Sequence, residues 1–304
     1  MSDVNHKKYP WLIAGILFSV LWASASTATK IGLTTAQPLT IALVRFTIAS
    51  ALMLFISHVL QGNRLPSGKE WKQLSIYGLL NISIYLGCYV IAMERVTAGI
   101  GSLAVATNPV FISFLSVFLL KRPLTLQSLV ALAICSGGVI CAAWPLLSEA
   151  SVTAPGLMIL LLSMLSYSLA SIYFSSQSWN DLHLFTINGW QTLLGGIFLL
   201  PVTWFYYQDA ENDFTYSFWG AVLWLAIPVS IVAVLLWLWL IRISAIRAGF
   251  WLFLCPVFGY AIAAVLMNDR IDEYTITGVA MVITGLLLSQ RSKKNIRSAK
   301  QLRD

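Results

Sequence analysis

Two stretches of the chain repeat one phrase: RVTAGIGSLAVATNPVF at residues 95–111 and RISAIRAGFWLFLCPVF at residues 242–258. They are 147 residues apart (242 − 95), and the same separation joins Gly138 to Gly285. Arg, Pro-Val-Phe and Gly recur in the same order in both copies, which is the mark of an internal duplication. The sequence therefore predicts two related halves.

The composition places those halves in a membrane. Of 304 residues, 58% are hydrophobic and only 10% are charged, and the mean hydropathy is +0.79. Apolar runs of roughly 20 residues, each long enough to cross a hydrocarbon core, alternate with short polar breaks. A β-barrel would need alternating apolar and polar residues, which these runs lack. We expect an all-α integral membrane protein with ten transmembrane helices, at residues 11–33, 38–60, 73–93, 97–120, 124–144, 154–175, 182–205, 216–240, 246–267 and 274–290.

Five spans per half force the two halves into opposite orientations, because a unit with an odd number of spans ends on the opposite side from where it began. We expect a first five-helix repeat at 11–145 and a second at 154–290, with a cytoplasmic N-terminal segment at 1–10 and a basic cytoplasmic tail at 291–304. The loop after the fourth span, LLKRPLT, is basic, whereas its counterpart after the ninth, LMNDRID, is mainly acidic. The predicted fold is two inverted repeats.

The charges also predict which side each loop faces. Of 19 Lys and Arg residues, two precede the first span, three follow the second, two follow the fourth, two bracket the eighth break and six follow the tenth. Since cytoplasmic loops carry the Lys and Arg excess, both termini are predicted to be cytoplasmic. This orientation accounts for the net charge of +7 better than nucleic-acid binding does. The first span resembles a signal peptide, and we expect it to be retained as a signal anchor.

Inverted repeats predict alternating access, in which two halves exchange conformations around a central site. A membrane enzyme would need a nucleophile, base or metal cluster, but the three His residues are isolated and the four Cys residues lack metal-ligand spacing. We therefore expect no catalytic residues, metal or cofactor. A channel would want a filter, which nothing here resembles. A structural or receptor role, which needs no inverted halves, is the other alternative.

The chain resembles the EamA-type permeases of the drug/metabolite transporter superfamily. The similar segments are LWASASTATKIG at 21–32, LVRFTIASALML at 43–54, the segment ending in Pro109 and GVAMVITGLLL at 278–288. The resemblance implies inner-membrane transport of a small metabolite, frequently export, through a cavity between the halves. Members usually have Glu after the fourth and ninth spans, where this chain has Arg122 and Asp269.

No Asp or Glu lies within a predicted span, which argues against an exchanger that binds protons and cations on a membrane carboxylate. Apart from Arg247, the second residue of its span, the charges inside the spans are Lys30 and Arg45. Lys30 either faces the cavity or snorkels to the interface. Arg45 is ~10 Å deep in its span at 1.5 Å per residue, where its fork of donors suits a carboxylate or phosphate. Alternatively, Arg45 holds helix-end carbonyls.

Other candidates line the same predicted cavity. Pro109 and Pro256 are expected to kink their spans, and Asn108 adjoins the first kink. Polar and aromatic side chains at helical spacing predict a partly aromatic lining, although the same residue types also serve close helix packing. These are Trp22, Ser24, Asn81, Tyr85, Tyr167 and Gln191. The expected partners are a small-molecule substrate and membrane lipid; the sequence leaves the oligomeric state open.

Overall fold

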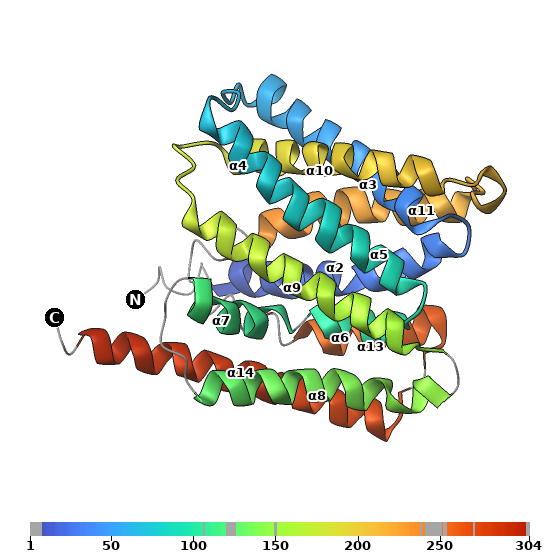
Figure 1. The fold of residues 1–304 in the computed structure, drawn as a ribbon, viewed down its shortest axis with the longest axis vertical. Coiled ribbons are helices and arrows are strands. Elements are labelled where there is room, and N and C mark those ends of the chain that lie inside the picture. Colours follow the sequence, from blue (N-terminus) through green and yellow to red (C-terminus); the bar gives the residue numbers. More distant parts are fainter. Residues whose placement is uncertain are drawn as a thin grey trace.

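A computed structural model describes residues 8–105, 107–119, 126–148, 151–237, 239–240, 251, 254–269 and 271–301. The described residues fold into a bundle of helices that run between two opposite ends, and none of these residues is in a β-strand (Figure 1). Arg122, Arg242, Arg247 and most of the second copy of the repeated phrase lie outside the described residues.

The first half contains five helical passages. They are α2 (Lys8–Leu33); α3 (Pro38–Leu54) continuing into the π-helical η1 (Phe55–Leu60); α4 (Lys69–Gly78), π-helical η2 (Leu79–Leu86) and α5 (Gly87–Met93) in series; α6 (Ala98–Val105) and α7 (Asn108–Leu119); and α8 (Leu126–Ser148). Each coincides with one of the first five predicted ranges.

The second half repeats this order. It comprises α9 (Ala154–Ser176); α10 (Leu184–Tyr206); the short 3-10 helix η3 (Asp209–Glu211); α11 (Tyr216–Trp224) continuing into the π-helical η4 (Leu225–Ala233); α13 (Leu254–Met267); and α14 (Glu273–Gln301). Helix α14 continues through most of the basic segment 291–304, which was predicted to be a tail.

Within the described residues, seven helical passages are long and apolar enough to cross a membrane. They begin at Pro10, Pro38, Lys69, Leu129, Ala154, Leu184 and Tyr216. Large apolar side chains cover the outside of the bundle, as at Phe118 (63% exposed) and Val265 (79%). Aromatic side chains are exposed where α10 ends and α11 begins, at Trp204, Phe205, Tyr206 and Tyr216, which is typical of a membrane interface. The protein is a multi-pass membrane protein.

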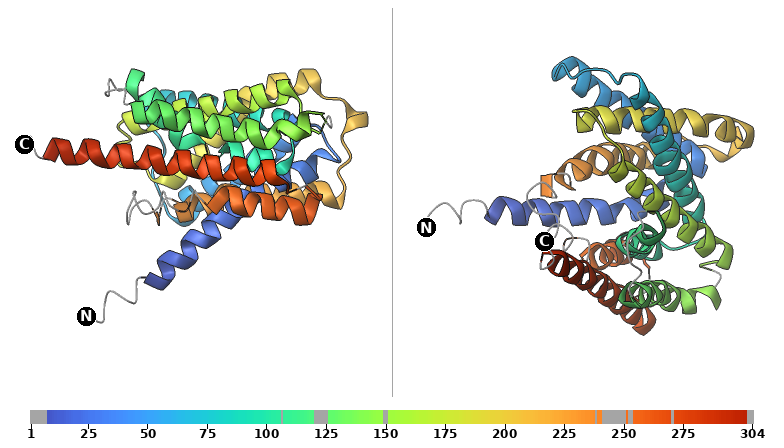
Figure 2. Two further views of the ribbon diagram at one scale, coloured as in Figure 1. Left: turned by 90° about the horizontal axis from the view of Figure 1, so that it is seen from below. Right: turned by 60° about the vertical axis from the view of Figure 1, so that its left-hand side comes forward.

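Helices α8 and α14 lie side by side and antiparallel (Figures 1 and 2). Contacts between them recur at positions shifted by the 147-residue repeat. A Cβ on Gly138 would meet the Gly278 carbonyl oxygen at 2.7 Å, and one on Gly285 would meet the Ala131 carbonyl oxygen at 2.9 Å. Adding 147 to Ala131 and Gly138 gives Gly278 and Gly285, so the two contacts are the same contact seen from each half. A two-fold relationship between antiparallel helices is the geometry of an inverted repeat.

The third helical passage of each half contains a long π-helical segment at the equivalent position. Segment η2 covers residues 79–86 and η4 covers 225–233, which is the same place after the shift of 147. Ser83 Oγ in η2 donates to the Gly195 carbonyl in α10, and the equivalent Ser230 in η4 accepts from Arg45 in α3. Each segment thus anchors to the other half. Long π-helical segments are rare and often mark functional sites.

Opposite ends of the bundle are closed by different loops. At one end, Asp213 N donates to Thr35 O (2.7 Å) and Thr153 N to Arg95 O (3.0 Å). At the other end, Arg64 pairs with Glu70 and donates to the Asn180 carbonyl, joining the loops after η1 and α9. Helix α2 begins and α14 ends at this second end (Figure 1). Hydrogen bonds therefore join the loops of the two halves at both ends of the bundle.

Candidate functional site

Arg45 is buried between the two halves of the bundle, with 6% of its surface exposed. Its Nε donates to Ser230 Oγ in η4 at 3.1 Å, and its guanidinium carbon lies 5.9 Å from the centre of the Phe46 ring. Ser230 Oγ in turn donates to the Leu225 carbonyl, which directs its lone pairs toward Arg45. The predicted depth of Arg45 places it in the interior, and the structure adds the contact with the second half.

Three tyrosines from two neighbouring passages gather beside this cation. The rings of Tyr85 and Tyr167 are 4.8 Å apart, and those of Tyr85 and Tyr89 are 6.3 Å apart. The phenols of Tyr85 and Tyr89 interact electrostatically with Arg45, and the Tyr89 hydroxyl lies 2.8 Å from Ser26 Oγ. Of the predicted aromatic lining, Tyr85 and Tyr167 thus come together with Arg45.

A chain of side-chain amides lies between α10 and the third passage. Asn81 Nδ2 donates to Gln191 Oε1 at 3.1 Å, and Gln191 Nε2 donates to Asn188 Oδ1 at 3.0 Å. Gln191 is buried, whereas Asn81 is half-buried. The two predicted amides therefore bond to each other across the halves.

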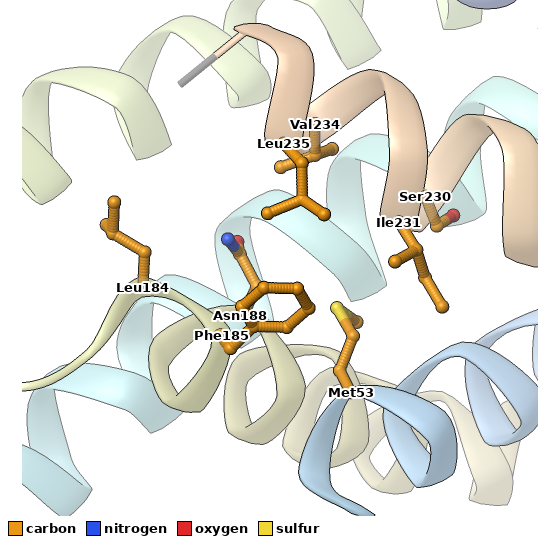
Figure 3. A pocket seen from close by; sticks show the side chains of 8 residues that line it. All are labelled: Met53, Leu184, Phe185, Asn188, Ser230, Ile231, Val234 and Leu235. Atoms are coloured by element: carbon orange, nitrogen blue, oxygen red, sulfur yellow. The ribbon is translucent and has the colours of Figure 1, made fainter. Parts of the chain in front are cut away.

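A small pocket opens where this amide chain approaches Ser230. Its lining comes from α3, α10, η4 and the residues after η4: Met53, Leu184, Phe185, Asn188, Ser230, Ile231, Val234 and Leu235 (Figure 3). Its volume is about 10 Å³, roughly what one water molecule requires. Asn188 extends into this apolar space, and Ser230 connects it to the Arg45 guanidinium. The pocket therefore lies beside Ser230, the residue that bonds to Arg45, and the rest of its lining is mainly apolar.

A second groove, of about 130 Å³, lies between α3 and α10. It faces outward, because Thr47, Ile197 and Leu200 in its lining are exposed. Thr47 Oγ1 and Ser50 Oγ donate to carbonyl groups of their own helix. The groove is therefore a poorer candidate for polar recognition than the Arg45 region.

Lys30 is half-buried near the end of α2 and within electrostatic range of Asp269 and Glu94, which are not partners of Arg45. Asp269 Oδ2 accepts from Gly99 N, 2.9 Å away, at the start of α6. The loop before α14 is thereby joined to the first half, and Lys30 has carboxylates within its electrostatic range. Lys30 therefore belongs with the loops at the end of the bundle where Asp269 bonds to Gly99. The two cations do not share one site.

Trp22 and Ser24 take part in helix contacts. Trp22 packs on Phe18, with ring centres 5.7 Å apart, in the apolar cluster around Trp251. Ser24 Oγ donates to the Leu21 carbonyl and accepts from Trp224 Nε1 at 2.8 Å. Both residues bind α2 to the second half rather than joining the Arg45 group.

The predicted proline kink at Pro109 takes the form of a break. Helix α6 ends at Val105 and α7 begins at Asn108, because proline lacks an N–H and its fixed φ suits the first turn of a new helix. The Pro109 side chain lies outside the described residues. Pro256 lies near the described start of α13, and the two residues before Leu254 lie outside the described residues. Asn108 is 4% exposed, and its Oδ1 has no hydrogen-bond partner among the described residues.

Two residues of the Arg45 region were not predicted from the sequence. Nothing in the sequence around Ser230 and Asn188 marks them as site residues. The packing of η4 and α10 against α3 brings Ser230 to the guanidinium and places Asn188 in the pocket beside Ser230. The 147-residue period offered one signal for Ser230, since it maps onto Ser83 in the matching passage.

A duplicated set of membrane-crossing helices enclosing a polar interior is the architecture of a membrane transporter. Residues 9–144 and 154–290 each match the EamA-like transporter family. The chain belongs to this family, and it is a transporter rather than an enzyme.

Curated relatives agree over nearly the whole length. The chain is 25% identical to an uncharacterized transporter of Archaeoglobus fulgidus over 90% of this chain and 94% of that one. It is 26% identical to Protein PecM of Dickeya dadantii over 89% of each chain. It is also 23% identical to the uncharacterized transporter YoaV of Bacillus subtilis over 90% and 94%. A solved crystal structure that is 17% identical shares the fold with a TM-score of 0.65, covering 95% of this chain and 99% of the other.

Proposed function

We propose that the protein is a secondary transporter of the inner membrane that exports a small metabolite, such as an amino acid or a related compound, by alternating access. The observation that carries this proposal is the exchange of contacts between the halves, seen in the α8–α14 pair and in the equivalent η2 and η4 segments. Two halves that use equivalent contacts can exchange conformations, giving two arrangements of similar energy related by the two-fold axis, which is what alternating access requires.

The two closed ends support the same mechanism. The Asp269–Gly99 bond and the Arg64–Asn180 bond each join loops from different halves, and they lie at opposite ends of the bundle. Breaking one set at a time would open the interior to one side while the other stays shut. The transported molecule would then meet the Arg45 region from either side.

Orientation follows from charge. Arg64, Lys69 and Lys72 lie at the end where α2 begins and α14 ends. At the other end lie the acidic residues Asp209, Glu211, Asp213, Asp269, Asp272 and Glu273. The Lys and Arg rule assigns the basic end to the cytoplasm, so we propose that both termini are cytoplasmic.

Reconstituted vesicles loaded with radiolabelled amino acids and related metabolites test the proposal. Saturable, protein-dependent efflux that accelerates when unlabelled substrate is added outside would support a carrier. Flux that rises linearly with concentration and shows no counterflow would indicate a channel instead. Absence of flux across the panel would count against the proposed substrate class.

A further inference from the structure

Arg45 carries a charge that the described protein does not neutralise. Its Nε is bonded to Ser230, but neither of its terminal nitrogens, Nη1 and Nη2, makes a hydrogen bond to a described residue. The nearest electrostatic partners are the phenols of Tyr85 and Tyr89, which are neutral at physiological pH. No Asp or Glu in the described part of the chain interacts with it. Leaving a buried guanidinium unpaired is costly, so its retention inside a membrane calls for a function.

A second unpartnered group lies next to this cation. Tyr85 is 6% exposed, and its hydroxyl makes no hydrogen bond to a described residue. The neighbouring Tyr89 hydroxyl is already paired with Ser26. Two donors of different kinds, the Arg45 fork and the Tyr85 hydroxyl, thus remain available in one region enclosed by both halves.

We propose, building on the transport function above, that the Nη groups of Arg45 bind the carboxylate of the transported metabolite, and that the Tyr85–Tyr167 pair receives its apolar part. The two parallel N–H donors of a guanidinium match the two oxygens of a carboxylate, which would supply the missing negative charge. Ser230 holds Nε from the side, which fixes the plane of the fork. The substrate class is an anionic or zwitterionic monocarboxylate with an apolar or aromatic side.

Purified protein in detergent provides a test that does not depend on transport. Thermal unfolding, followed by intrinsic tryptophan fluorescence, is measured with L-phenylalanine, L-leucine, benzoate and phenylacetate, each compared with its amide at equal concentration. At least one carboxylate should stabilise the protein while its amide does not. Sodium chloride at the same concentration separates a carboxylate site from a general anion site.

Substitutions identify the residue responsible. Arg45→Met should weaken the apparent affinity for the stabilising carboxylate at least about tenfold, since it removes a charge-assisted bond. Arg45→Lys, which keeps the charge but not the fork, should weaken it less than Arg45→Met does. Arg95→Met, which removes an exposed arginine at the end of the bundle, is the matched control and should leave the affinity unchanged.

The outcomes separate this inference from the proposed function. Equal stabilisation by acids and amides, equal stabilisation by chloride, no stabilisation at all, or a response that survives Arg45→Met would each overturn the carboxylate site. Vesicles that still show saturable flux in those cases would leave the transport function standing. If a carboxylate binds through Arg45 in detergent but vesicles show no flux of it, transport of that compound would instead be refuted.

Discussion

The thiol of Cys135 donates to the carbonyl oxygen of Val282 at 3.5 Å, and these two residues are separated by 147 positions, the period of the sequence repeat. They are therefore equivalent residues of the two halves that contact each other, which happens only on a symmetry axis. The contacts on either side obey the same symmetry: Gln127 bonds to Leu288 O, and Cys141 bonds to Tyr274 O. The axis that relates the halves passes through the α8–α14 interface, between Cys135 and Val282.

A disulfide should form across this axis. In a variant whose only cysteines are Cys135 and one introduced by Val282→Cys, mild oxidation should link α8 to α14, because the two residues contact each other on the axis. A disulfide requires Cα atoms about 4.4–6.8 Å apart. After protease cleavage at a site engineered between α8 and α9, the halves should migrate together on a non-reducing gel. Leu287→Cys, exposed on the outer face of α14, should give separate halves. Equal linking in both variants would contradict the placement of the axis.

Close packing of the same helix pair makes a sharp stability prediction. A Cβ added by Gly278→Ala would meet the Gly138 carbonyl oxygen at 2.5 Å, so backbone must shift, and overpacking of this kind costs about 1–3 kcal/mol. Gly220→Ala meets nothing within 4 Å and should stabilise its helix by about 0.5 kcal/mol. Thermal unfolding in detergent should therefore show a lower midpoint for the first variant only. An unchanged midpoint for Gly278→Ala would mean that α8 and α14 are further apart.

The two aspartates around the start of α14 should differ in their effect on access. Asp269 bonds to Gly99 N in the other half, whereas Asp272 Oδ1 accepts from Thr275 N within its own half. Removing either carboxylate with Ala should cost about 1 kcal/mol of stability. Only Asp269→Ala should open the interior, since only Asp269 joins the halves.

Alkylation measures that opening. Cys255 is 1% exposed and its carbonyl accepts from Ser102 Oγ, about one turn deeper in α6 than the Gly99 contact. With Cys255 as the single cysteine, an impermeant maleimide should react about fivefold faster in Asp269→Ala, as expected for a shift of ~1 kcal/mol. Asp272→Ala should react at the parent rate. Identical rates in the two variants would argue that the Asp269 bond does not close this end.

Reporter fusions test the orientation. A fluorescent protein that folds only in the cytoplasm should be bright at both the amino and carboxyl termini, and a phosphatase that is active only outside should be inactive at both. In the 207–215 loop the phosphatase should be active, because that loop is acidic and lies at the opposite end. Termini found in different compartments would rule out an even number of spans.

Sequence alone determined the class, the duplication and the approximate span positions. These follow from composition and from a fixed period, both of which are local or one-dimensional properties that lipid enforces: an apolar run of ~20 residues has few alternatives to a helix. The same reasoning selected Arg45, because a charge in an apolar run is conspicuous. Depth in the span also favoured Arg45 over Lys30, but the sequence left open whether Lys30 faces the cavity or snorkels to the interface.

Only the tertiary structure decided which of those residues meet. Ser230 reached Arg45, Asn81 reached Gln191 and Asp269 reached Gly99 through contacts between residues 110 to 185 positions apart. The proline at position 109 predicted an irregularity in its span, but the paired π-helical segments went unpredicted, because their geometry depends on packing between the halves rather than on propensity. A lipid solvent fixes where helices lie along the chain, but the choice of neighbours rests on small-residue contacts and individual hydrogen bonds, which a sequence pattern does not record.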